Sequence, residues 1–133
     1  MSDRFQLRVV TPTSETVNEE VFEVTAPGTL GEFGILPDHA AFLSSLEVGC
    51  LLYRGPSGEH RIAIREGFAE VSDNVMTILS EAATVKDEVD ISGATADLQD
   101  ARAKLVELST FDAEFADVDA ARRWAEARLA LTK

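Results

Sequence analysis

Residues 67–79 read GFAEVSDNVMTIL, two short apolar-rich runs separated by a polar turn. Phe68 to Val71 and Val75 to Leu79 each have the length of a strand, and Ser72-Asp73-Asn74 between them consists of residues that favour tight turns. This stretch therefore predicts a β-hairpin.

The residues before this hairpin repeat the same pattern. Apolar side chains alternate with polar ones around Phe5 to Val9, Phe22 to Ala26 and Ile62 to Ile64. Gly55-Pro56-Ser57-Gly58 is a strong turn signal between two such runs. Many short strands with regular turn residues predict a small β-sandwich or flattened barrel over residues 1–86.

The pattern becomes helical after Lys86. A single apolar stripe recurs at intervals of three and four residues, which is typical of one helix face. Asp90 or Ser92 can cap the start of this helix. The stripe consists of Ile91, Ala94, Leu98, Ala101, Leu105 and Leu108.

A second helix is predicted from Asp117, after a polar connection. Its apolar stripe is thin and alanine-rich, formed by Ala120, Trp124, Ala127 and Leu131. Two such helices joined by a short connection predict an antiparallel hairpin over residues 87–133. We expect this hairpin to pack weakly and to open at modest cost. The predicted fold class is α+β, with the β-sandwich first and the two-helix hairpin second.

The composition argues against nucleic acid and lipid as partners. Asp and Glu number 24 against 12 Lys and Arg, a formal net charge of −12. Such a chain is repelled by phosphate backbones and by anionic lipid headgroups. The acidity indicates either a soluble, self-repelling surface or a protein partner with basic patches.

Residues that carry chemistry are few. The single cysteine, Cys50, lies in an apolar run and is interpreted as a small core residue in a reducing compartment. His39 and His60 lack metal-ligand spacing, so no metal site is expected. Without a nucleophile–base pair or a phosphate loop, we expect no catalytic residues and no enzyme activity. The N-terminus resembles no leader, and no apolar run is long enough to span a membrane, so the chain is expected to stay cytosolic unless a partner holds it at a membrane.

The segment 27–40, PGTLGEFGILPDHA, has three glycines and two prolines. It predicts a defined turn and bulge path, and we expect Gly34 to need a backbone conformation with φ > 0. Phe33, Ile35 and Leu36 either fill the core or form a small apolar contact tip.

This segment resembles the epsilon subunit of bacterial F-type ATP synthases, in which G-x-F-G-I-L-P-x-H-A follows P-G. The resemblance covers the whole chain, although the helices alone would not identify the family. Further matches are Val9-Val10-Thr11-Pro12, Leu46 and Gly49, Gly67-Phe68-Ala69-Glu70-Val71, Asn74-Val75-Met76-Thr77-Ile78-Leu79 and Glu81-Ala82-Ala83.

The resemblance implies a non-catalytic rotor subunit of a proton-translocating synthase. It implies binding to the gamma subunit and to the ring of c subunits, at the cytoplasmic face of the bacterial plasma membrane. Glu32 is then a solvated turn acid or a partner for a basic group on the ring. His39 is a structural residue, a partner contact or a pH sensor. The implied ring-facing loop comprises Glu32, Phe33, Gly34, Ile35, Leu36, Pro37 and His39.

The resemblance also implies that the helical hairpin regulates ATP hydrolysis by extending into the catalytic head of alpha and beta subunits. Arg122, Arg123 and Arg128 give this arm a local positive charge that can engage an acidic segment there. The alternative is that these arginines form ordinary surface pairs near a helix C-terminus.

Some family members bind ATP in the folded hairpin, but the motif is incomplete here. Residues 89–94 have Gly93 in place of its arginine, and residues 98–103 have Gln99 in place of its aspartate. We therefore expect no tight ATP binding and no other cofactor. The alternative to a synthase subunit is a free-standing β-sandwich that binds other proteins.

Overall fold

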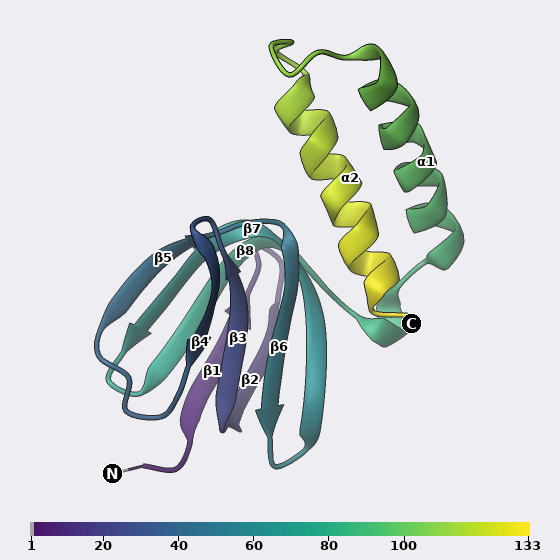
Figure 1. Cartoon of the computed structure of the whole chain (residues 1–133). Coiled ribbons are helices and arrows are strands. Elements are labelled where there is room, and N and C mark those ends of the chain that lie inside the picture. Colours follow the sequence, from purple (N-terminus) through teal and green to yellow (C-terminus); the bar gives the residue numbers. More distant parts are fainter. Residues whose placement is uncertain (1) are drawn as a thin grey trace.

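A computed structural model describes residues 2–133. Eight strands are followed by one turn of 3-10 helix and two α-helices (Figure 1), so the predicted order is confirmed. The second helix begins two residues earlier than predicted. The elements are β1 Phe5–Val10, β2 Glu15–Val21, β3 Glu23–Gly28, β4 Gly31–Ile35, β5 Phe42–Leu46, β6 Gly49–Gly55, β7 Gly58–Ser72, β8 Val75–Val85, η1 Lys86–Glu88, α1 Ile91–Glu107 and α2 Phe115–Ala130.

The strands form a sandwich that is closed by β6. Neighbouring strands follow the order β2-β1-β8-β7-β5-β3-β4, and β6 pairs with both β3 and β7. The β1–β8 pairing is parallel, whereas the other pairings are antiparallel. The predicted β7–β8 hairpin is present, and Asp73 and Asn74 at its turn have φ of 52° and 62°. Two successive positive φ values match the right-handed twist of the strands that they join.

The core follows the alternation seen in the sequence. In β1 the inward side chains Phe5, Leu7 and Val9 are buried, and the residues between them are half-buried. Ile62 and Ile64 of β7 and Met76 and Ile78 of β8 are fully buried in the same cluster. Burial of these apolar side chains is the main force that stabilises the sandwich.

Strand β7 bends where it changes partners. Residues 58–64 pair with β6, and residues 67–71 pair with β5. At this corner a Cβ on Gly67 would overlap the carbonyl oxygen of Leu79 on β8. The buried hydroxyl of Ser80 donates to backbone carbonyls there, including Ala82 O at 2.9 Å. The corner therefore needs a residue without a side chain and one small hydroxyl.

The first part of the glycine-rich segment, residues 27–35, belongs to the β3–β4 hairpin, and residues 36–40 lie in the connection to β5. Residues 27–28 end β3, and β4 begins at Gly31, whose φ is 125°. The prediction for Gly34 is wrong: it lies within β4, its φ is outside the positive range, and an added Cβ would meet only Val24 O at 3.9 Å. The residue that needs a positive φ is Gly31, because the tight turn comes just before β4.

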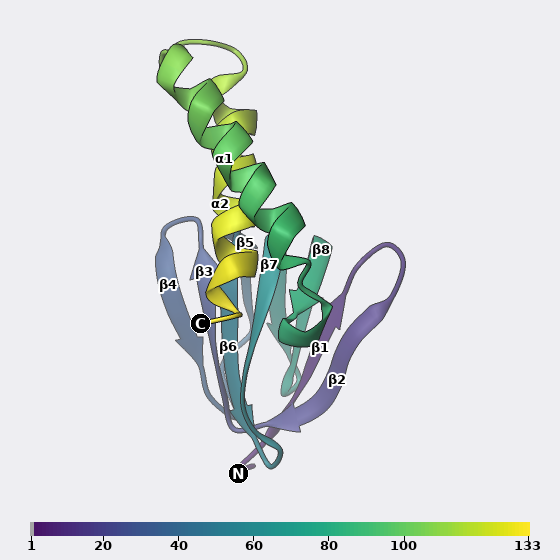
Figure 2. The same cartoon turned by 90° about the vertical axis from the view of Figure 1, so that its right-hand side faces the viewer.

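Helix α1 begins at Ile91, and its cap is Asp90, the first of the two predicted candidates, whose carboxylate accepts a hydrogen bond from Gly93 N at 3.1 Å. Ala94 and Ala101 of its predicted stripe are buried, but Ile91 is 55% exposed. The helical pair lies against one end of the sandwich and extends beyond it (Figures 1 and 2).

Helix α2 uses its apolar stripe mainly on the sandwich. Ala127 and Leu131 are buried in a small cluster with Ala63 of β7, and Cys50 and Trp124 pack around it. The expectation that this stripe would pack on α1 is therefore only partly met. Cys50 is half-buried at this contact, and its thiol lies 3.4 Å from Ala127 O as a donor. Burial raises the pKa of this thiol.

Candidate partner-binding surfaces

A largely apolar concavity lies on the outer face of β1, β8, β7 and β5. Val10, Leu79, Phe68 and Ser45 are successive cross-strand neighbours and form one row across these four strands. Phe68 is 57% exposed and Leu79 is 52% exposed. With Pro12 and Leu46 they line a groove of about 660 Å³. Large apolar side chains gathered in one concave surface indicate a binding site.

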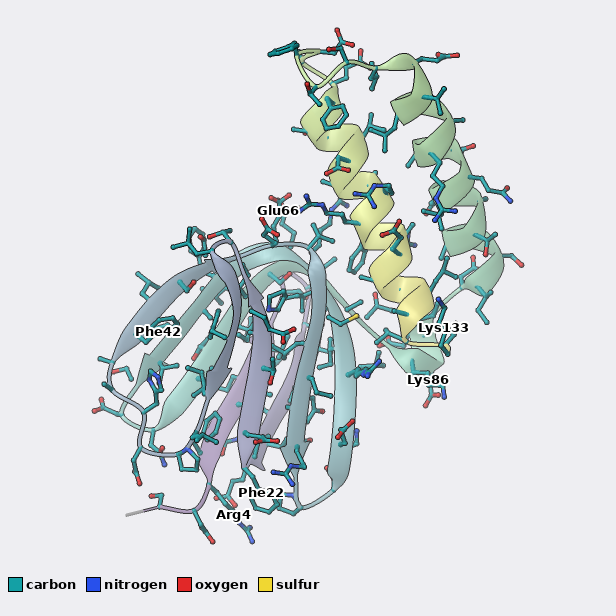
Figure 3. The ribbon with its side chains drawn as sticks, viewed as in Figure 1. Arg4, Phe22, Phe42, Glu66, Lys86 and Lys133 are labelled. Carbon is teal, nitrogen blue, oxygen red and sulfur yellow. The ribbon has the colours of Figure 1, made fainter. Side chains whose placement is uncertain are left out.

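The rim of this groove is acidic. Glu66 and Glu81 line it, and no Lys or Arg is among the described lining residues, although Arg65 approaches Glu81 from beside the groove at 4.0 Å. Glu66 lies at the end of the sandwich nearest the helical pair (Figure 3). Leu30, at the β3–β4 turn beside the groove residue Thr29, is fully exposed. A partner for this groove therefore needs an apolar ridge with basic residues at its edges.

A second cleft joins the groove to α2. Its lining shares Thr29, Leu46 and Glu66 with the groove and adds residues from the first half of α2. Arg123 of α2 crosses this cleft and pairs with Glu47 at 3.3 Å. The helical pair therefore lies across this cleft from one side of the groove.

The predicted ring-facing residues are divided between a strand and a loop. Glu32 and Gly34 of β4 are exposed, but Ile35 is a fully buried core residue. Phe33 is half-buried, and its ring lies 5.1 Å from that of Phe42. The core alternative thus holds for Ile35 and Phe33, and the contact-tip alternative is left for Leu36.

Leu36, Pro37 and His39 lie in the connection from β4 to β5. Leu36 is 60% exposed and Pro37 is half-buried. His39 is exposed, with Nδ1 2.7 Å from Ala40 O and its ring edge-on to Phe42 at 5.7 Å. Glu32 lies near the hairpin turn and His39 beyond the other end of β4. The set thus follows one side of the sandwich and does not gather at one tip.

The three arginines of the predicted arm are engaged in ion pairs. Arg122 contacts Asp119 at 2.7 Å and Glu126 at 3.0 Å, and the hydrogen bond with Asp119 raises its pKa. Arg123 pairs with Glu47 of the sandwich, and Arg128 pairs with Asp97 of α1 at 2.9 Å. Two of the three arginines therefore tie α2 to its neighbours.

Sequence reasoning missed the groove, although a signal for it was present. Phe68 is next in sequence to buried Ala69, and Leu79 is next to buried Ile78. Adjacent strand residues point to opposite faces, so both strands carry apolar residues on both faces. A strand with apolar side chains on its outer face as well as its inner face is covered on both sides, either by its own chain or by a partner.

Among residues 2–133, no three His, Cys, Asp or Glu side chains are grouped so that they could hold a metal ion. Within the same range, neither helix has the length and apolar character that crossing a bilayer requires.

Comparison with known proteins identifies the family. The sequence model for the family described as "ATP synthase, Delta/Epsilon chain, beta-sandwich domain" matches residues 4–86. ATP synthase epsilon chain 2 of Syntrophotalea carbinolica is 38% identical over 97% of this chain and 94% of its own. The ATP synthase epsilon chain of Geobacter sp. strain M21 is 41% identical, with coverages of 91% and 88%.

A solved structure agrees with these relatives. A chain in the mitochondrial ATP synthase of Euglena gracilis, in a structure of OSCP, F1 and the c-ring, superposes with a TM-score of 0.82. It is 25% identical, and the match covers all of this chain and 84% of that one. The β-sandwich with its apolar outer groove and appended helical pair therefore belongs to a member of the ATP synthase epsilon chain family.

Proposed function

We propose that this chain is a non-catalytic rotor subunit of a proton-translocating F-type ATP synthase, linking the gamma subunit to the ring of c subunits. Membership of the epsilon chain family supports the part of this proposal that places the chain in an ATP synthase complex. The observation that carries the role is the groove with half-exposed Phe68 and Leu79, since such a surface suits a permanent protein contact.

The groove is the proposed contact for gamma. It is apolar at its centre and acidic at its rim, through Glu66 and Glu81. Its floor consists of paired strands, so it changes shape little when load is applied. Transmission of torque requires a stiff contact, which a floor of hydrogen-bonded strands provides.

The side of the sandwich along β4 is the proposed contact for the ring. Three exposed side chains lie there and can contact a partner: the carboxylate of Glu32, the apolar side chain of Leu36 and the imidazole of His39. Among residues 2–133, Glu32 has no ion-pair partner within 4.0 Å. Its carboxylate is therefore available to pair with a basic group on a neighbouring subunit. Phe33 and Ile35 hold this side against the core.

The helical pair is proposed to restrain ATP hydrolysis when it leaves the sandwich. In the conformation described here the guanidinium groups of Arg122, Arg123 and Arg128 are occupied by carboxylates of the same chain. Contact with the alpha and beta subunits through these groups requires that the ion pairs to Glu47 and Asp97 open first. The Arg123–Glu47 pair is exposed and worth less than about 1 kcal/mol. The side chain of Arg128 is only 18% exposed, so its pair with Asp97 is the firmer of the two.

The proposed location is peripheral, at the cytoplasmic face of the membrane, where the complex holds the chain. No tight ATP binding is proposed, because Gly93 stands where the family motif has arginine. In this fold the N–H of Gly93 donates the capping hydrogen bond to the carboxylate of Asp90.

Two matched substitutions test the two contacts. Phe68→Ser removes an aromatic anchor from the groove, and affinity for isolated gamma should fall by about 10-fold or more. Leu36→Ser removes a similarly exposed apolar residue from the β4 side, so binding to gamma should be unchanged while association with the ring weakens. Equal affinity of wild type and Phe68→Ser for gamma would show that the groove is not the contact. Absence of any gamma binding by the wild type would favour a free-standing binding module.

A further inference from the structure

Three segments that are far apart in the sequence meet at the end of the sandwich away from the helical pair. They are residues 2–4, the turn between β7 and β8, and the β4–β5 connection, residues 36–41. Arg4 lies at this end of the sandwich (Figure 3). The β4–β5 connection carries exposed Leu36 and His39, which belong to the side proposed to contact the ring.

One side chain joins these segments. Asn74, at the β7–β8 turn, accepts a hydrogen bond from Asp38 N through Oδ1 at 2.8 Å. Its Nδ2 donates to Arg4 O at 2.7 Å. The main-chain oxygen of Asn74 also accepts a bond from Gln6 N at 3.1 Å, which holds the turn against the start of β1. Both ends of the side-chain amide are therefore used, each in the role that its partner requires.

The β4–β5 connection is held at a single residue. Among residues 2–133, hydrogen bonds from this connection to other segments occur only at Asp38, whose N–H donates to Asn74 and whose carboxylate accepts from Ser2 N at 2.7 Å. Asp38 has a φ of 62°. A residue with a side chain keeps such a backbone only where its surroundings hold it. The shape of the connection is therefore set from outside, by Asn74 and Ser2.

We propose that Asn74 is a positioning residue for the ring contact: it holds Asp38 so that Leu36 and His39 are presented to the ring in one arrangement. This inference rests on the proposed ring contact along the β4 side. A surface that is ordered before it binds loses less entropy on binding. Asn74 acts through Asp38, because its own amide is used within the chain.

The backbone at the turn allows this side chain to be removed without disturbing the turn. Asp73 and Asn74 have φ of 52° and 62°. Glycine adopts such values without a steric penalty, and a glycine following an aspartate is favoured in two-residue hairpin turns. Asn74→Gly thus deletes both side-chain hydrogen bonds and keeps the turn. Asp73→Gly is the matched control, because the side chain of Asp73 takes no part in the contacts with Arg4 and Asp38.

Titration of full-length variants against the purified ring of c subunits, and separately against isolated gamma, tests the proposal. Asn74→Gly should weaken binding to the ring about 5-fold or more, the equivalent of about one net hydrogen bond. Its affinity for gamma should equal that of Asp73→Gly, and the two variants should have the same Tm. Amide exchange at Asp38 should be faster in Asn74→Gly alone. A merely structural role would instead lower Tm and weaken both contacts alike, which would overturn the proposal.

Leu36→Ser separates failure of this inference from failure of the ring contact. If Leu36→Ser weakens ring binding and Asn74→Gly does not, the positioning role is overturned and the ring contact stands. If neither variant changes ring binding, the ring contact is wrong and the inference falls with it. Equally fast exchange at Asp38 in Asp73→Gly and Asn74→Gly would show that the turn backbone holds the connection, which also overturns the role of the amide.

Discussion

Gly67→Ala tests the corner of β7, on which both the sandwich and the floor of the groove depend. A Cβ at this position would overlap the carbonyl oxygen of Leu79 and lie 2.9 Å from its carbonyl carbon and 3.0 Å from Ser80 Cα. All three atoms belong to the backbone of β8, so no side-chain rotation relieves the contact. The strands must move apart, which breaks hydrogen bonds of the β7–β8 ladder.

The expected loss in the free energy of unfolding is about 3 kcal/mol, the upper part of the range for overpacked sites. For a chain of this length that corresponds to a fall in Tm of about 10 °C. Urea unfolding followed by far-UV circular dichroism measures the free energy, and a thermal scan measures Tm. The m-value should stay unchanged, because the surface exposed on unfolding is nearly the same.

Gly34→Ala is the matched control, since the same methyl group is added to another strand glycine. Its Cβ would meet only Val24 O at 3.9 Å. Stability should be unchanged or should rise by about 0.5 kcal/mol, because alanine loses less backbone entropy in a strand. If Gly67→Ala were as stable as Gly34→Ala, the reasoning about backbone approach at the corner would be refuted.

Three further changes test the helical pair. Asp90→Ala removes the cap on Gly93 N and should cost about 1 kcal/mol, seen as faster amide exchange in the first turn of α1; equal protection would contradict the cap. Leu131→Ala should open the contact over Cys50 and bring the raised pKa of the Cys50 thiol back toward its ordinary value. Alkylation of Cys50 by iodoacetamide near neutral pH should then be faster, whereas an unchanged rate would show that Leu131 does not shield the thiol. Truncation before Asp90 should leave a sandwich that folds alone and should relieve any inhibition; a chain that fails to fold would contradict the proposed division at residue 86.

Periodicity predicted most of the fold. Alternation in β1 reflects burial of one strand face, and the spacing of Ala94 and Ala101 reflects burial of one helix face. The turn at Asp73-Asn74 was also predicted, since these residue types tolerate positive φ. These features depend on local chemistry, which a single sequence displays.

Features that depend on distant contacts were not predicted. The stripe of α2 was assigned to α1, but Ala127 and Leu131 meet Ala63, which is more than sixty residues away. The positive φ was assigned to Gly34 because three glycines stood in one segment, and only the strand register shows that Gly31 carries it. The groove also depends on distant pairing, since β1 and β5 place Val10 and Ser45 beside the Phe68–Leu79 pair of the predicted hairpin.

Affinity isolation of the tagged chain from detergent-solubilised membranes, with identification of partners by mass spectrometry, tests the central claim most directly. The account predicts recovery of the gamma subunit, the catalytic subunits and the c subunits with the wild-type chain, and loss of gamma with Phe68→Ser. Recovery of the wild-type chain alone would contradict the rotor role.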